Sequence, residues 1–288
     1  MADVVELGGV GSPPVLSGYL VLSCGVGALV DAGPASVADE YVRRARARTS
    51  GSRLEYVLIT HVHLDHAGGT RRVLELEPGA RAAVYSRGAK HLVDPSRLLE
   101  SSRGVLGDIV DVWGGMEPVD SRRLVVLEDG EELAVGCSKA RLIATPGHAP
   151  HSSAWYLPEE GVLFAGDSAG MLLPGEGGAI WPLAPPPFRM DLFLDSLSKM
   201  ETLSPELLCV SHFGCVRDVR DYLREVRRRY LEVDEAVAEA CERGLRGHAL
   251  LEYVLSALGI RAPAGRVEEA MLRNIKGLPG YSRCTSER

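Results

Sequence analysis

The sequence predicts an α+β fold, an αβ/βα sandwich in which helices cover two sheets, followed by an all-helical C-terminal extension. Short β-rich runs alternate with helical runs in the first half of the chain, and the second half repeats this alternation. Beyond His212 the apolar residues recur at spacings of three and four, which is typical of helices. We therefore expect the sandwich over residues 1–215 and the extension over residues 216–288. A chain of 288 residues with 45% hydrophobic content can bury a core of this size.

The first expected elements are a hairpin and a helix. Residues 18–33 contain two apolar runs around Gly25 and Gly27, which predicts a hairpin that turns near these glycines. Residues 36–48 have the spacing of an amphipathic helix, and Ser36 is a suitable N-cap.

Two strands and a second hairpin are expected next. Residues 54–60 are a continuous apolar strand, and residues 80–86 form another strand after a segment with helical periodicity. Residues 123–136 place Asp129-Gly130 between two apolar runs, and this dipeptide is the strongest short signal of a hairpin turn.

Three further strands end, like residues 54–60, at a side chain that can bind a metal. These strands end at His148, Asp167 and His212, and the second of them is the return strand of a hairpin. Loops that follow the strands of one sheet commonly build a single site. We therefore expect these side chains to meet at one edge of the sandwich.

The C-terminal extension is predicted to contain three helices. Residues 217–244 form a long helix with a narrow apolar seam, and residues 250–258 and 267–275 form two shorter ones. The extension either packs on the sandwich or pairs with a second copy of the chain in a homodimer.

The composition of the chain indicates where in the cell the protein is expected and which classes of partner are excluded. The net charge is −7 and the chain has no long run of Lys and Arg, so we expect no nucleic-acid partner. No stretch has the apolar length needed to cross a membrane, and the N-terminus lacks the pattern of a secretory signal. We expect a soluble, cytoplasmic protein.

The six cysteines are scattered without a CxxC pair, which argues against a thiolate zinc site or a compact disulfide framework. We expect most of them to be small buried residues. Asn occurs once and Gln never. This depletion of heat-labile amides suggests a hyperthermophilic source, a setting in which intracellular disulfides do occur.

The residues with the clearest chemistry lie in "THVHLDHAGG", which follows the strand at residues 54–60. His61 and His63 are two apart and project to the same side of an extended segment, while Asp65 and His66 follow where a helix is expected to begin. Such a junction can offer ligands to two adjacent ions. With His148, Asp167 and His212 the site would have seven ligands, and five of the eight histidines would belong to it.

These motifs resemble those of the metallo-β-lactamase superfamily, whose HxHxDH signature is matched by His61, His63, Asp65 and His66. The resemblance extends in order to "TPGH", "LFAGD" and "VSHFG", and it covers roughly residues 15–215. It implies the four-layer sandwich of that family. Within the family the chain is most similar to the glyoxalase II-like branch, including members with a "PPPF" stretch after the aspartate, here at residues 185–188.

The resemblance also implies a division of the ligands between two divalent metal ions. Zinc is the expected metal, with iron or manganese as alternatives. By analogy with the family, the first ion is held by His61, His63 and His148, the second by Asp65, His66 and His212, and Asp167 bridges the two.

The activity implied by the resemblance is that of a binuclear hydrolase, in which a metal-bridging hydroxide opens a thioester, a lactone or another ester-type bond of a small molecule. Asp65 and Asp167 are the expected catalytic residues. A mononuclear iron persulfide dioxygenase, which would use only His61, His148 and Asp167, stays open as an alternative. A phosphodiesterase or nuclease would favour a basic surface, and the intact ligand set argues against a non-catalytic metal-binding protein.

Further residues are expected around the ligands. Three residues lie beside the ligands or in a turn that can support them, and these are candidates for orienting the ligands. Three other residues are candidates to line the substrate pocket. The orienting candidates are Asp31, Thr60 and Thr145, and the pocket candidates are His151, Trp181 and Phe188. Each has a simpler interpretation: Asp31 as a turn residue, His151 as a surface or supporting histidine, and the "WPLAPPPF" loop as a rigid connection.

Overall fold

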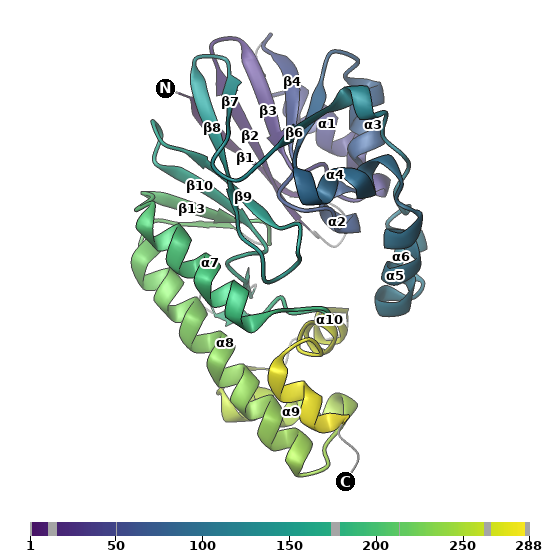
Figure 1. The fold of residues 1–288 in the computed structure, drawn as a ribbon, viewed down its shortest axis with the longest axis vertical. Coiled ribbons are helices and arrows are strands. Elements are labelled where there is room, and N and C mark those ends of the chain that lie inside the picture. The colour runs from purple at the N-terminus through teal and green to yellow at the C-terminus, as the bar shows by residue number, and fades with distance from the viewer. Residues whose placement is uncertain are drawn as a thin grey trace.

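Two six-stranded sheets face each other, and helices cover both outer faces (Figure 1). The computed structural model describes residues 2–10, 16–49, 51–173, 179–212, 214–261 and 266–285. One apolar cluster, which includes Trp155 and Phe164, lies between the sheets. A second lies between the first sheet and its helices, and a third lies between the second sheet and the C-terminal helices. The predicted four-layer sandwich is confirmed.

The first sheet contains the N-terminal half of the chain. Its order is β1-β2-β3-β4-β5-β6, antiparallel from β1 to β3 and parallel from β3 to β6. The strands are β1 (Asp3–Val10), β2 (Leu16–Ser23), β3 (Val26–Val30), β4 (Arg53–Leu58), β5 (Arg81–Tyr85) and β6 (Leu124–Leu127). The helices of this half are η1 (Ala35–Val37), α1 (Ala38–Arg46), α2 (Leu64–Ala67), α3 (Thr70–Leu76), α4 (Ser86–Val93), α5 (Ser96–Leu106), α6 (Ile109–Val112) and η2 (Ser121–Arg123).

The second sheet has the order β14-β13-β10-β9-β8-β7, with a small ribbon, β11-β12, beside it. Its strands are β7 (Glu132–Val135), β8 (Ser138–Ala144), β9 (Ser153–Leu157), β10 (Val162–Gly166), β13 (Leu207–Val210) and β14 (Gly214–Val216), and the ribbon is β11 (Met171–Leu172) and β12 (Ile180–Trp181). The helices are α7 (Met190–Thr202), α8 (Val219–Glu242), α9 (Gly247–Ala257), α10 (Arg266–Asn274) and η3 (Pro279–Cys284).

The first predicted hairpin is confirmed, but the predicted N-cap is wrong. Strands β2 and β3 pair in register around a turn at Cys24 and Gly25, both of which have positive φ. Ser36 lies instead within the 3-10 turn η1, and α1 begins at Ala38 without a side-chain cap. The backbone N–H of Ser36 donates to the carbonyl of Trp113, so a tertiary contact determines the conformation of this segment.

The predicted hairpin at Asp129-Gly130 is also wrong. The turn forms, but β6 pairs with β5 in the first sheet and β7 pairs with β8 in the second. The reason is that the turn docks on β8: Gly130 N–H donates to Leu142 O, and the Asp129 carboxylate accepts from Ala144 N–H at 2.8 Å. The dipeptide therefore marks the point where the chain crosses from one sheet to the other.

The interpretation of the cysteines needs correction, because all six are paired. The disulfides are Cys24–Cys137, Cys209–Cys215 and Cys241–Cys284. Only Cys209 and Cys241 are buried. The sequence spacing gave no sign of these pairs because two of them join segments that meet only in the folded chain. Cys24–Cys137 links turns of the two sheets, and Cys241–Cys284 ties the end of α8 to η3.

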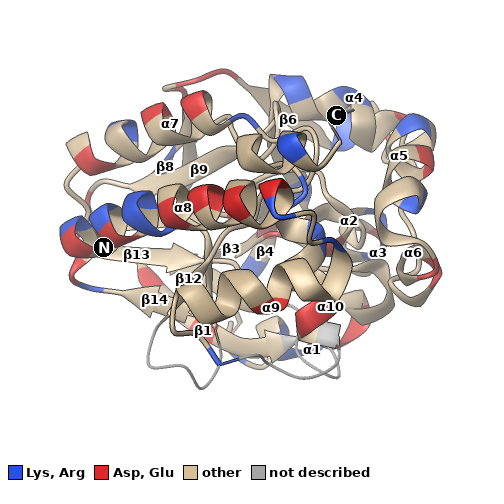
Figure 2. Ribbon diagram, turned by 90° about the horizontal axis from the view of Figure 1, so that it is seen from below, with Lys and Arg blue, Asp and Glu red and all other residues tan. Residues whose placement is uncertain are grey.

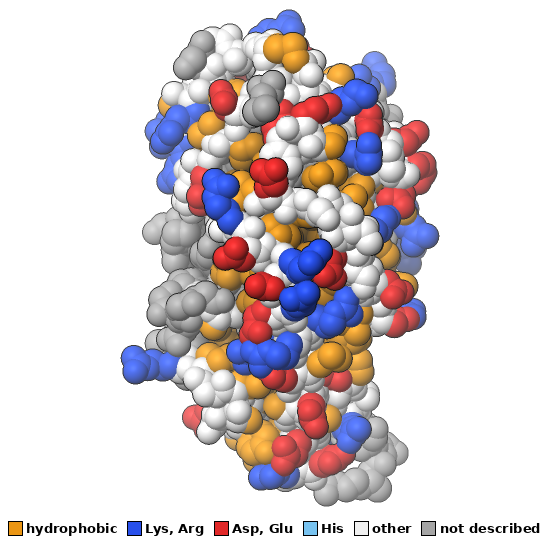
Figure 3. All heavy atoms as spheres, turned by 90° about the vertical axis from the view of Figure 1, so that its left-hand side faces the viewer, with side chains coloured by type: hydrophobic (Ala, Val, Ile, Leu, Met, Phe, Trp, Pro, Cys, Tyr) orange, Lys and Arg blue, Asp and Glu red, His pale blue; other side chains and the backbone are white. Residues whose placement is uncertain are grey.

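The three helices of the extension form close to their predicted bounds. The apolar seam of α8 is buried within the chain, where residues such as Val226, Val233 and Val237 join a core shared with β9, β10 and α7. Along α8 the basic residues gather in the N-terminal half, whereas most of the acidic residues lie in the C-terminal half (Figure 2). Charged side chains of both signs are scattered over the face shown in Figure 3. The expected boundary between sandwich and extension at residue 215 and the expected homodimer stay predictions.

Among the described residues, no helix is long and apolar enough to cross a membrane.

Candidate metal centre

The predicted ligands come together at one edge of the sandwich, although four separate segments carry them. Each segment follows a strand: the first leaves β4 and enters α2, and the others leave β8, β10 and β13. The strand β4 belongs to the first sheet and β8, β10 and β13 belong to the second, and the side chains that follow their ends converge where the two sheets face each other. The residues brought together are His61, His63, Asp65, His66, His148, Asp167 and His212.

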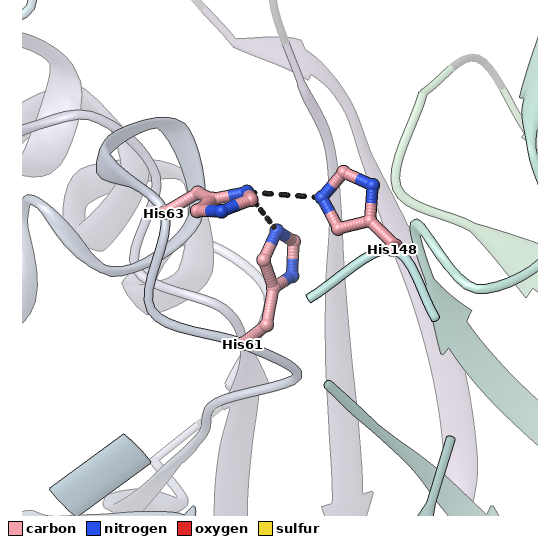
Figure 4. A group of neighbouring side chains, drawn as sticks. All are labelled: His61, His63 and His148. Carbon is pink, nitrogen blue, oxygen red and sulfur yellow. Dashed lines mark hydrogen bonds between the residues drawn. The ribbon is translucent and has the colours of Figure 1, made fainter. Parts of the chain in front are cut away.

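Three histidines form the first group, which we call the first triad: His61, His63 and His148 (Figure 4). His63 Nδ1 lies 3.1 Å from His61 Nε2 and 2.9 Å from His148 Nε2. Nitrogens bound to a tetrahedral zinc at about 2.0 to 2.1 Å are about 3.3 Å apart. The three nitrogens therefore surround a point where one cation would fit.

Asp65, His66 and His212 form the second group, the second triad. Asp65 Oδ2 lies 3.7 Å from His66 Nε2 and 3.8 Å from His212 Nε2. The donor set of two imidazoles and one carboxylate is common for zinc and similar divalent ions.

Asp167 stands between the two triads and presents a different oxygen to each. Its Oδ2 lies 3.8 Å from His61 Nε2 and 3.5 Å from His148 Nε2. Its Oδ1 lies 3.3 Å from His66 Nε2 and 3.4 Å from His212 Nε2. A single carboxylate is thus placed to complete two neighbouring ligand sets at once.

Two buried atoms of this cluster test whether the residues fit a cation. His66 Nε2 and Asp167 Oδ1 are buried and have no hydrogen-bond partner among the described residues. Burying polar atoms without partners is costly, and such atoms are rare in folded proteins. A cation between them would satisfy both atoms, so the donor set fits a metal.

Asp31 orients the ring of His66 from behind. Its Oδ2 lies 2.8 Å from His66 Nδ1, and this contact directs Nε2 toward Asp167. The Thr60 N–H and hydroxyl both donate to the Asp31 carboxylate. Asp31 itself adopts φ 59°, a conformation that non-glycine residues rarely take. Hydrogen-bonded carboxylates of this kind fix the tautomer and direction of metal-binding histidines.

Comparison with known proteins identifies the family. Residues 14–212 match the sequence profile of the Metallo-beta-lactamase superfamily. The chain belongs to this superfamily. Its members are metal-dependent hydrolases whose fold binds divalent metals, as the histidine clusters here indicate.

Relatives within the superfamily agree with the glyoxalase II-like resemblance. The metallo-beta-lactamase fold-containing protein ST1585 of Sulfurisphaera tokodaii is 34% identical over 168 residues, 57% of this chain and 62% of its own length. A hydroxyacylglutathione hydrolase of Cereibacter sphaeroides is 29% identical over 168 residues, 56% of this chain and 49% of its own length. In sequence, this chain thus spans less than two thirds of either relative.

Solved structures show the same fold over nearly the whole chain. The crystal structure of ST1585 has a TM-score of 0.73 and 24% identity, and the match covers 99% of this chain and 100% of that one. The superfamily protein TTHA1429 from Thermus thermophilus has a TM-score of 0.70 and 25% identity, with coverage of 97% and 93%. The fold with its C-terminal helices is therefore shared.

The pKa values of the histidines are shifted in opposite directions in the two triads. Burial holds the pKa of each histidine of the first triad below its ordinary value. Burial also opposes charge on His66 and His212, but the nearby carboxylates, Asp167 foremost and Asp65 with it, together outweigh burial and raise the pKa of both histidines. Burial alone would raise the pKa of Asp167, yet the nearby His66 and His212 hold it well below its usual range. The two histidines of the second triad therefore bind protons at higher pH than the histidines of the first triad.

Thr60 and Thr145 also lie where orienting residues were expected. Thr60 Oγ1 lies 3.2 Å from His61 Nδ1, on the side of the ring away from the first triad. Thr145 Oγ1 hydrogen-bonds Ser168 Oγ at 2.8 Å and so joins the loops that carry His148 and Asp167. Their effect on metal binding, like that of Asp31, stays a prediction.

The three predicted pocket residues occupy different places. The His151 ring centroid lies 5.5 Å from that of His63, and His151 Nδ1 accepts weakly from Val62 N–H at 3.4 Å. Trp181 is fully buried and donates to Met271 O, while the Phe188 ring lies 5.4 Å from that of Phe193 in the same core. Their contact with a substrate stays a prediction.

One contact of the site was missed from the sequence. His148 Nδ1–H donates to the backbone carbonyl of Leu183 at 2.7 Å, which leaves the lone pair of Nε2 facing the other two nitrogens of the first triad. Every residue has a carbonyl, so no side-chain pattern could have marked this position.

Proposed function

We propose that the protein is a binuclear metal-dependent hydrolase of small molecules with an ester-type bond, a thioester first and a lactone or another carboxylic ester next. The observation that carries the proposal is the position of Asp167. Its two oxygens face different histidine pairs at 3.3 to 3.8 Å, as a carboxylate shared by two cations would. The first triad would hold one ion and the second triad the other.

The bound ions would lower the pKa of a shared water and polarise the carbonyl oxygen of the substrate. This chain would supply the remaining chemistry. Asp31, Thr60 and the Leu183 carbonyl, which contact the ring nitrogens that face away from the metal positions, would hold the imidazole rings in the tautomer and direction that binding requires. Neither a serine nor a cysteine nucleophile is required, and the six cysteines are in disulfides.

Asp65 would move the proton. Its side chain is 17% exposed, compared with 5% for Asp167, so it lies at the solvent side of the cluster. A carboxylate there can accept the proton released by the attacking water and pass it to the departing thiolate or alkoxide.

The preference for a thioester rests on the relatives. A hydroxyacylglutathione hydrolase acts, by its name, on an acylated thiol, and several such proteins match this chain. We do not extend the proposal to glutathione. Arg220 and Arg224 on α8, which could receive an anionic tail, face Glu201 at 3.9 Å and Asp221 at 3.1 Å.

Metal analysis coupled to a substrate panel tests the proposal. Elemental analysis of the native protein should give two metals per chain, with zinc expected and iron or manganese as alternatives. A panel of thioester, lactone, phosphodiester and persulfide substrates should show hydrolysis of the ester-type members. Asp167→Ala should lose metal and activity, whereas His248→Ala, which removes an exposed residue paired with Glu268, should retain both. Full activity of Asp167→Ala, or a single iron with oxygen uptake on a persulfide, would reject the proposal.

A further inference from the structure

We infer that the C-terminal extension builds part of the metal centre, and that Tyr230 on α8 is a positioning residue for His148. The inference rests on the proposed function, because it concerns the metal position of the first triad. Tyr230 does not touch that position. It acts through the backbone of Leu183, whose carbonyl accepts the Nδ1–H of His148.

The direction of the His148 ring depends on one peptide unit, the one that joins Leu183 to Ala184. Its carbonyl accepts from His148 Nδ1–H at 2.7 Å, and its N–H donates to the carbonyl of Asn274 on α10 at 2.9 Å. A peptide that donates at one end becomes a stronger acceptor at the other. The extension therefore sets both the place and the strength of this acceptor.

The segment that carries this peptide is anchored to the extension along its length. Trp181 Nε1–H donates to Met271 O at 3.3 Å, and Gly277 N–H donates to Ala184 O at 2.9 Å. Both partners belong to α10 or to the turn that follows it. Residues 181–184 thus connect the sandwich, through His148, to helices far away in the sequence.

Tyr230 supplies the side-chain part of this anchor. Its hydroxyl oxygen accepts from Leu183 N–H at 2.8 Å, and its ring stacks on Phe193 with centroids 4.1 Å apart. The whole side chain is buried, so water has no access to replace the hydroxyl. Removal of the hydroxyl would leave a buried N–H without a partner, and the Leu183 carbonyl would shift away from His148.

Zinc binding by Tyr230→Phe tests the inference. The variant keeps the ring and loses only the hydroxyl. It is compared with Val237→Ala, which removes two methyl groups from a fully buried residue on the same helix and destabilises the same core. Each change is made in the full-length protein and in a His212→Ala background, where the second triad is incomplete and the zinc that remains reports the first triad.

Competition with a chromophoric chelator should show zinc bound to the first triad about tenfold more weakly in Tyr230→Phe. Val237→Ala should unfold at a lower temperature with zinc affinity unchanged. Equal zinc affinity in Tyr230→Phe and Val237→Ala would overturn the inference and leave the proposed function standing. A wild-type protein that binds no zinc, iron or manganese would overturn both.

Discussion

At the residue scale, three of the seven candidate ligands are each paired with a second group that fixes the direction of the imidazole ring. His66 contacts Asp31, His61 contacts Thr60, and His148 donates to a backbone carbonyl. Such groups orient the rings before a metal arrives and so reduce the entropy lost on binding. Direct evidence would come from substitutions that spare the ligands and change only their supports.

Asp31→Asn is the sharpest such substitution. It keeps the size of the side chain and removes the charge that faces His66 Nδ1 at 2.8 Å. We expect zinc to bind the second triad about 10 to 100 times more weakly, since that is the usual effect of losing a supporting carboxylate. Chelator competition measures this affinity. Asp111→Asn, at an exposed carboxylate that pairs with Arg103, is the matched control, and equal affinities in the two variants would show that Asp31 is only structural.

The pKa shifts predict that the two metals leave at different pH. In the metal-free protein the pKa values of His66 and His212 are raised because the surrounding carboxylates, Asp167 foremost, together outweigh the effect of burial. Protons therefore compete with the metal at the second triad as soon as the pH falls below these raised values. The pKa values of the first triad are lowered by burial, so its histidines stay neutral to lower pH.

Dialysis at decreasing pH, followed by elemental analysis, should therefore release one metal before the other. The metal released first should be the one already missing in His212→Ala. Release of both metals at one pH, or earlier release from the first triad, would contradict the assignment.

At the element scale, the sequence predicted the ends of β4, β10 and β13 to within two residues, but β8 ends at Ala144 rather than at His148. Apolar runs that stop shortly before His61, His148, Asp167 and His212 can be seen without a structure, because a buried strand must be apolar and its end leaves the core. Which strands pair with each other was harder to predict from the sequence. Asp129-Gly130 has the local chemistry of a hairpin turn, but its partner is β8, and only the folded chain shows that contact.

The hairpin of β13 and β14 gives a prediction at this scale. Cys209 and Cys215 face each other across it and are joined, so the disulfide closes the short turn that carries His212. The hydroxyl of Tyr19 donates to Val210 O and Gly214 O on either side of the same turn. We expect the paired substitution Cys209→Ser with Cys215→Ser to loosen this turn and weaken zinc binding by the second triad.

The disulfide Cys24–Cys137 provides the control, because it joins turns at the opposite end of β8 from the site. Replacing either pair should lower the melting temperature, since both crosslinks restrict the unfolded chain. Only the Cys209–Cys215 replacement should lower the zinc content. Equal zinc content in the two double variants would contradict a role of this disulfide at the site.

At the scale of the whole molecule, the sequence predicted the helices of the extension, but it did not predict their contacts with the metal centre. Periodicity predicted its helices within a few residues, because apolar spacing is a local property. Periodicity could not show that the segment around Leu183 forms hydrogen bonds with α8 and α10 and also accepts a hydrogen bond from His148. Contacts of the backbone leave no pattern in the side chains. The seven candidate ligands could be predicted because each carries its own chemistry.

The account depends most on the claim that Asp167 lies between two metal ions. Anomalous diffraction from crystals of the zinc-loaded protein tests it directly. We predict two peaks that flank the Asp167 carboxylate, one beside the first triad and one beside the second. A single peak, or a pair of peaks that Asp167 does not join, would contradict the account.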